Sequence, residues 1–97
     1  MTWIVDICGV PVPEPDDYSE MRAGMLGYLT GVSFLDVSLT QTWDGSVNAV
    51  FRLDRPDAVE AIGVASWCFG VSAAYVDGID RFRITRMAVY AETGKER

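Results

Sequence analysis

The sequence predicts one α+β domain in which two helices cover one face of a four-stranded antiparallel sheet. Three observations lead to this fold class. The 97 residues suit a single domain. The shares of apolar residues, 49%, and charged residues, 23%, are typical of a globular protein. Strand-like and helix-like periodicity follow one another in the order β, α, β, β, α, β. We expect the domain to span residues 1–90, with a charged, mobile tail over residues 91–97.

The first strand is predicted over residues 3–10, which are apolar and rich in β-branched side chains. Side chains alternate along a strand, so Trp3, Val5 and Ile7 share one face. An almost wholly apolar strand is typical of the centre of a sheet. The proline-rich stretch 11–15 ends this strand.

The first helix is expected to begin at Asp17, whose carboxylate can cap backbone amides, with Glu20 completing a capping box. Gly31 is the expected C-cap. Glycines at 24 and 27 weaken this helix, since each costs about 1 kcal/mol relative to alanine. The apolar residues at helical spacing are Tyr18, Met21, Met25, Tyr28 and Leu29.

Residues 34–53 predict a β-hairpin. The Asp44-Gly45 pair is typical of a two-residue turn, but that turn would place the two apolar sets on opposite faces. A three-residue loop over 43–45 instead pairs Val37 with Phe51, and Leu35 with Leu53. Gly45 then takes the left-handed position of a type I turn with a bulge.

The second helix is predicted to run from about Pro56 to about Val76. The spacing of its residues predicts an inner stripe of Ala58, Ile62, Ala65, Phe69, Ser72 and Val76. The last strand follows over residues 81–90, with Phe82 and Ile84 facing inward. Its alternation slips near Arg86 and Met87, which indicates a bulge or the end of the strand.

A split βαβ arrangement of the ferredoxin-like kind satisfies this order of elements, because each helix is long enough to cross over the sheet. Both helices then lie on one face of an antiparallel sheet. A swapped strand order is the alternative.

The net charge of −6 is unevenly distributed: residues 1–80 carry −9 and residues 81–97 carry +3. The acidic body disfavours nonspecific binding to phosphate backbones. RNA-recognition domains of this topology stack bases on aromatic side chains of the two central strands. Those positions carry no aromatic here, so no nucleic-acid partner is expected. They are Ile4, Asp6, Cys8, Asn48, Val50 and Arg52.

Asp6 is expected to pair with Arg52 and Arg83 across this face of the sheet. Cys8 and Cys68 each lie in an apolar run, which indicates reduced core thiols in a cytoplasmic protein. The first residues lack the pattern of a signal peptide. The uncharged stretch 61–76 is shorter than the ~20 residues that span a bilayer, so no membrane partner is expected.

No catalytic, metal-binding or cofactor-binding residue is predicted. The chain has no histidine, which excludes a serine triad and a Cys–His pair. Asp16 and Asp17 lie where a helix start favours acids anyway. Cys68 has no positive neighbour in sequence to lower its pKa.

Small residues recur along both predicted helices, and we expect these two flanks to face each other. The first flank comprises Gly24, Gly27 and Gly31, which do not fit a phosphate-binding glycine pattern. The second comprises Gly63, Ser66 and Gly70.

One candidate site rises above this background. The side of the second helix opposite its inner stripe should be polar, yet it carries Val64, Trp67 and Val71 beside Glu60. Such a surface favours a protein interface, most simply in a homodimer. The alternatives are cover by the first helix, the tail or a loop, and a ligand groove beside Trp67.

Three stretches resemble small ferredoxin-like proteins of unknown function from actinobacteria and their phages: residues 2–10, the alanine-rich helix over residues 54–74, and residues 82–92. The use of seven arginines against one lysine also suits a GC-rich genome. The resemblance implies the fold and a cytoplasmic setting, and it implies no activity.

The leading functional hypothesis is a non-catalytic protein–protein interaction module that self-associates or docks on a partner protein. If the chain is phage-encoded, that partner would be a host protein that it regulates. The alternative hypothesis is a small-ligand-binding regulatory domain of ferredoxin-like topology. An enzyme is the least favoured class.

Overall fold

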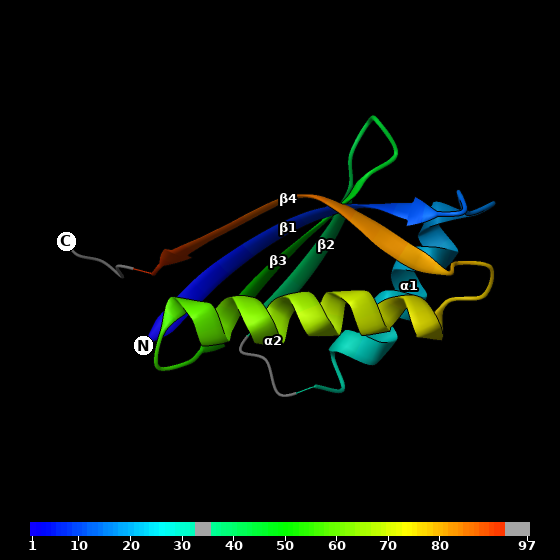
Figure 1. Cartoon of the computed structure of the whole chain (residues 1–97). Coiled ribbons are helices and arrows are strands. Elements are labelled where there is room, and N and C mark those ends of the chain that lie inside the picture. The colour runs from blue at the N-terminus through cyan, green and yellow to red at the C-terminus, as the bar shows by residue number, and fades with distance from the viewer. Residues whose placement is uncertain (33–35, 93–97) are drawn as a thin grey trace.

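A computed structural model describes residues 1–32 and 36–92 and confirms the predicted fold class. The strand order is β2-β3-β1-β4, all neighbours are antiparallel, and both helices lie on one side of the sheet (Figure 1). This is the ferredoxin-like topology. The elements are β1 (Thr2–Val12), α1 (Tyr18–Leu29), β2 (Asp36–Gln41), β3 (Val47–Asp54), α2 (Ala58–Val71), the 3₁₀ helix η1 (Ser72–Tyr75) and β4 (Arg81–Ala91).

The core lies between the sheet and the two helices. β1 is central, as predicted, and its Val5 and Ile7 are fully buried, while Trp3 packs at the edge of the core. Phe51 and Leu53 of β3 lie beside them, in the register that pairs Val5 with Phe51. From α1 the core takes the predicted Met21, Met25 and Leu29.

The approach of α2 to the sheet is closest at Gly9 in β1. A methyl group placed on Gly9 would lie 2.8 Å from Cε2 of Phe69. The Phe69 ring in turn packs against Phe82 of β4, with centroids 4.9 Å apart. The pairing of β1 with β4 shifts register at the same place, between Cys8 and Gly9.

That register shift is the bulge in the last strand. Cys8 pairs with Arg86 and Gly9 pairs with Ile84, which leaves Thr85 as the extra residue. The predicted slip is therefore real and lies one residue before Arg86. Phe82 is buried as predicted, whereas Ile84 is 41% exposed at the sheet edge. β4 extends to Ala91, one residue into the segment predicted as the tail.

The cap at the start of α1 is confirmed. The Asp17 carboxylate accepts hydrogen bonds from the backbone amides of Ser19, at 2.9 Å, and Glu20, at 3.2 Å. At the other end the prediction of Gly31 as the C-cap is wrong. The C-cap is Thr30 in a right-handed conformation, and Gly31 N–H donates to the carbonyl of Tyr28 without a positive φ.

The hairpin has the predicted three-residue loop. Val37 pairs with Phe51, Thr42 N–H donates to the carbonyl of Ser46 at 2.9 Å, and Gly45 has a φ of +85°. Leu35, whose pairing with Leu53 was also predicted, lies outside the described residues. The Asp44 carboxylate holds the loop by accepting hydrogen bonds from the Thr42 hydroxyl and the Ser46 amide.

The predicted inner stripe of the second helix is partly wrong. Ala65, Phe69 and Ser72 are buried as expected, but Ala58, Ile62 and Val76 are only half-buried. Ala61 and Cys68 are buried in their place. The helix also begins later and ends earlier than predicted, since its N-cap is Asp57 and its last turn tightens into η1.

The predicted contact between two small-residue flanks is wrong. Gly63 and Gly70 are exposed, and a methyl group added to either would meet no atom within 4 Å. Gly24 instead approaches η1, where an added methyl would lie 3.1 Å from the carbonyl oxygen of Tyr75. Tyr75 also stacks on Tyr28 of α1, with centroids 4.4 Å apart. The helices therefore meet through η1.

The close approach at Gly9 predicts the effect of a matched pair of glycine substitutions. Gly9→Ala should lower the free energy of unfolding by about 1–3 kcal/mol, because the methyl group forces the Phe69 ring from its position. Gly27→Ala, on the open side of α1, should raise it by about 0.5–1 kcal/mol. Urea unfolding measures both, and wild-type stability of Gly9→Ala would contradict the packing.

The hairpin loop predicts a dependence of stability on pH. The hydrogen bonds from Thr42 and Ser46 lower the pKa of Asp44 below its ordinary value. The native state therefore favours the carboxylate, so this contribution is present at neutral pH and is lost as pH falls below about 4. Asp44→Asn should reduce stability at pH 7 and flatten the acid limb of a plot of stability against pH. Asp16→Asn, outside the loop, is the control, and an unchanged acid limb in Asp44→Asn would contradict the assignment.

Candidate functional site

The candidate interface lies on α2, which the sequence positions by a cap and an apolar inner face. The Asp57 carboxylate accepts a hydrogen bond from the Glu60 amide at 2.9 Å and so begins the helix. Ala61 and Ala65 are fully buried, and their small side chains let the helix lie close to the sheet. The outward side is left to solvent.

The three residues predicted for an interface do not share one environment. The Trp67 side chain is 66% exposed, so neither α1 nor any described loop covers it. Val64 and Val71 are half-buried on the flank of α2, and Val64 packs against the core. Of the predicted set, Trp67 alone is mainly exposed to solvent.

The exposed side of α2 includes residues that the sequence pattern did not predict to be part of an interface. Val59 is 81% exposed and begins a row that continues at helical spacing on the same side as Trp67. We call this row the α2 ridge; it comprises Val59, Gly63, Trp67 and Gly70 of α2 and Ala74 of η1. Its signal in the sequence is the i, i+4, i+8, i+11, i+15 spacing of uncharged residues, but glycines at such spacing also suit the helix contact predicted for them.

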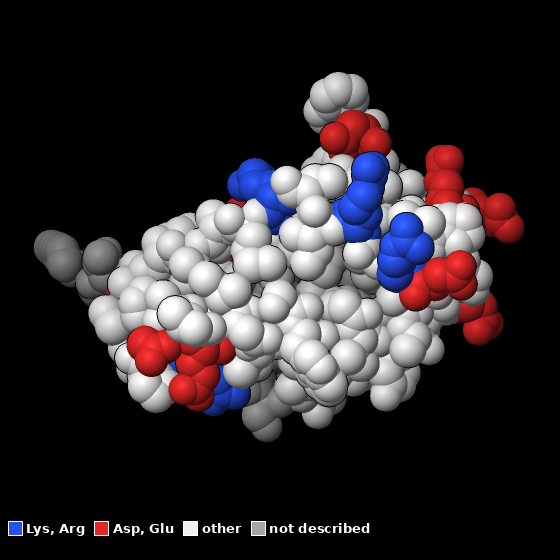
Figure 2. All heavy atoms as spheres, in the orientation of Figure 1, with Lys and Arg blue, Asp and Glu red and all other residues white. Residues whose placement is uncertain are grey.

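The ridge lies within a broad uncharged surface. Figure 2 looks onto α2 and shows acidic and basic side chains at the margins of this face and uncharged atoms across its middle. Glu60 is the only charged residue within α2, and it lies in the first turn. An uncharged surface with an exposed tryptophan is typical of a contact site.

The segment Ala58–Tyr75 is also long and apolar enough to cross a membrane, judged by its 18 residues and its composition alone. A core helix of a soluble protein meets the same criterion. A third of the residues in this window are buried inside the domain, where they pack on the sheet.

The open face of the sheet carries a polar network that differs from the predicted one. Asp6 accepts a hydrogen bond from Asn48 at 2.5 Å and lies 3.5 Å from the guanidinium of Arg86, so its predicted partners Arg52 and Arg83 are wrong. Arg52 instead forms two hydrogen bonds with Glu92, at 2.7 and 3.1 Å. These contacts join strands that are distant in sequence.

Both cysteines are unpaired and buried, as predicted. Cys8 faces the open side of the sheet, where the Arg86 guanidinium covers it at 3.1 Å from Sγ. Burial raises the pKa of the Cys68 thiol, although hydrogen bonding to Tyr28 opposes this shift. Cys68 is therefore protonated at neutral pH and is a poor nucleophile.

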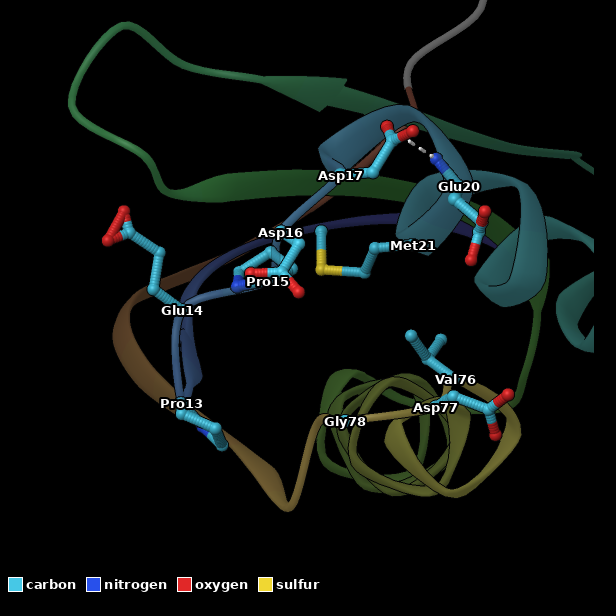
Figure 3. Close-up of a pocket in the computed structure, with 10 residues that line it drawn as sticks. All are labelled: Pro13, Glu14, Pro15, Asp16, Asp17, Glu20, Met21, Val76, Asp77 and Gly78. Atoms are coloured by element: carbon cyan, nitrogen blue, oxygen red, sulfur yellow. Dashed lines mark hydrogen bonds between the residues drawn. The ribbon is translucent and has the colours of Figure 1, made fainter.

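A shallow hollow of about 590 Å³ lies between the loop after β1, the start of α1 and the end of η1. Figure 3 shows the Met21 side chain extending toward Pro15 and Asp16 and Val76 on the opposite wall, whereas Glu14 points outward. Carboxylates of Asp16, Glu20 and others form the rim. Among the described residues, no group of three or more acidic, histidine or cysteine side chains is arranged to hold a metal ion.

A scan against protein-family models finds no match, and searches of curated proteins and of solved structures find none either. The ferredoxin-like fold therefore rests on strand order and register alone. Functional conclusions must come from the surfaces of this chain.

Proposed function

We propose that this chain is a non-catalytic protein–protein interaction module that self-associates through the α2 ridge. A single observation carries the proposal: the exposed Trp67 side chain stands between two glycines, Gly63 and Gly70, that leave open space beside it. A large apolar side chain held in solvent on an uncharged face is stabilised when a partner covers it.

The spacing of these residues makes the ridge self-complementary. Gly63 lies four residues before Trp67 and Gly70 three residues after it, which is about 6 Å and about 4.5 Å along the helix axis. In an antiparallel pair of α2 helices about a two-fold axis, each Trp67 can lie over a glycine of the other copy. The same contact then forms twice, as an isologous interface requires.

The charge distribution also favours a second copy of this chain as the partner that covers the α2 ridge. The acidic and basic side chains lie at the margins of the α2 face, so joining two such faces buries no unpaired charge at the centre. Tryptophan at the centre of a patch with small neighbours is typical of residues that dominate interface energies. A different protein on the same ridge, such as a host target of a phage-encoded regulator, is the other outcome.

The hollow beside α1 favours a second candidate function, the binding of a small ligand. Its volume lies within the range usual for ligand sites, and its rim of carboxylates around Met21 and Val76 suits a cation with an apolar body. Polyamines and arginine derivatives have this chemistry. Ligand binding is the less favoured of the two functions because the rim carboxylates are exposed to water, which weakens their attraction for a cation.

The self-association predicts that Trp67→Glu converts a dimer into a monomer without unfolding the domain. A buried, unpaired carboxylate at the centre of the interface would raise the dimer dissociation constant by at least about a hundredfold. Sedimentation equilibrium over a range of protein concentrations measures this shift. The free energy of unfolding of the monomeric variant should stay within about 0.5 kcal/mol of that of a wild-type monomer.

The chain offers a matched control for this experiment. Trp43 at the tip of the hairpin is 98% exposed, and Trp43→Glu makes the same chemical change away from α2. It should leave the association unchanged. A second test is Gly70→Leu, which fills the space beside Trp67 on an exposed face. A wild-type monomer at high concentration, or equal effects of Trp67→Glu and Trp43→Glu, would refute self-association through the ridge.

The ligand hypothesis predicts that spermidine or arginine amide raises the thermal midpoint of the chain. Saturation at about a hundred times the dissociation constant would stabilise the fold by about 2.7 kcal/mol. Paired substitution of Asp16→Asn and Glu20→Gln should remove the shift, and Asp36→Asn on β2 should keep it. Sodium chloride at matched ionic strength is the blank, and shifts no larger than this blank would reject the site.

A further inference from the structure

The edge strand β4 lies outside the proposed α2 interface and has features of its own that suit a contact. β4 is terminal in the sheet and pairs with β1 alone among the described strands. It is 11 residues long, and most of its side chains are exposed. Such an edge presents backbone groups to which another extended chain can pair.

The register shows which backbone groups face outward. The Glu92 N–H donates to the carbonyl of Thr2, so the residues that alternate with Glu92, namely Tyr90 and Ala88, direct their backbone groups toward β1. Met87, Val89 and Ala91 therefore direct their N–H and C=O groups away from the sheet. These groups can accept a further strand without breaking a bond to β1.

The two sides of this edge differ in chemistry. Arg81, Arg83 and Arg86 lie on the open face of the sheet, since they pair with Val12, Val10 and Cys8. Basic side chains are visible along this half of β4 in Figure 2. On the side that faces α2, Ile84 and Met87 are 41% and 36% exposed.

We propose that β4 is the docking edge for an extended, acidic segment of a partner protein, which adds to the sheet as a further strand. Alternate residues of that segment would be acidic, facing the three arginines, and apolar, facing Ile84 and Met87. The basic edge contrasts with the net charge of −9 on residues 1–80, so it selects an acidic segment against a basic one. Of these arginines, Arg86 is engaged by Asp6, at 3.5 Å.

A second copy of this chain does not fit the same edge. Full antiparallel pairing of two β4 strands would centre on Arg86 and set it opposite its own counterpart. Like charges directly opposite one another destabilise a strand pair. The arginines thus disfavour pairing of two β4 strands in this register, and their charge favours an acidic segment as the occupant.

The test uses a synthetic peptide of about eleven residues, the length of β4, that alternates valine and glutamate. Titration into the isotopically labelled chain should shift the backbone amide resonances of Met87, Val89 and Ala91. A peptide alternating valine and lysine, and a peptide with the valines and glutamates in two blocks, are the matched controls. Neither control should bind at the same concentrations.

Three changes test the two parts of the contact. The double variant Arg81→Glu with Arg83→Glu should weaken binding of the acidic peptide by at least about tenfold. Met87→Pro removes an outward N–H without removing a bond to β1, and should abolish binding in a folded chain. A peptide methylated on alternate backbone nitrogens tests the same bonds on the unaltered protein.

The outcomes separate this inference from the proposed self-association. Trp67→Glu should bind the acidic peptide as the wild type does, because the ridge takes no part in the contact. Amide shifts confined to other elements, or equal binding of the glutamate and lysine peptides, would overturn the docking edge. Absence of binding by any peptide would also overturn it and leave the arginines with the role of preventing edge pairing.

Discussion

The packing of Phe69 over Gly9 determines where the second helix lies, and much of the molecule follows from it. No side chain larger than hydrogen fits at Gly9 beneath the ring, whose edge would be 2.8 Å from an added methyl carbon. The same ring rests on Phe82, so α2 is held over β1 and β4 together. Small buried residues along the inner face of α2, such as Ala61 and Ala65, also let the helix lie close to the sheet. The opposite side of the helix stands in solvent, and β4 forms an edge of the sheet.

The open face of the sheet is occupied by its own side chains. Asp6 is held by Asn48 and Arg86, and Arg52 is held by Glu92. The Asp6 contacts join β1 to its neighbours β3 and β4, and the Arg52–Glu92 pair reaches across β1 from β3 to the end of β4. These contacts hold the strands in register and also satisfy the polar groups there. The α2 ridge and the backbone edge of β4 lie outside this network and remain open to a partner.

The predictable parts of the fold are those in which local pattern and tertiary packing agree. The hairpin register followed from side-chain alternation, because a slip by one residue would have turned Val37 and Phe51 to opposite faces. The Asp17 cap followed from local hydrogen bonding. The phase of α2 was harder, since that helix is apolar on all sides and its spacing alone admits several inner stripes. Proximity to the sheet selected Ala61 and Cys68 over Ala58 and Ile62.

The site could be predicted only in part, for a related reason. Trp67 was identified from sequence because an aromatic residue on an outward helix face contradicts the amphipathic pattern. Its glycine neighbours were assigned to the wrong contact, because small residues suit close helix packing and open surface alike, and only tertiary structure separates the two. The partners of Asp6 and Arg52 depend on pairing between residues 40 or more apart and on the extra residue at Thr85. No local pattern encodes such pairs.

The two proposed contacts reinforce each other physically. Adding a short strand to one edge forms a modest number of backbone hydrogen bonds, and ordering the flexible segment costs conformational entropy. A single β4 edge would therefore bind its partner weakly. A dimer formed through the α2 ridges would carry two such edges, related by the two-fold axis. A partner with two acidic segments, or a partner that is itself a dimer, would then bind the second edge at a high effective concentration, provided that its linker spans the two sites. Association through Trp67 would in this way set the strength of binding at β4, although no residue of the ridge contacts the acidic strand.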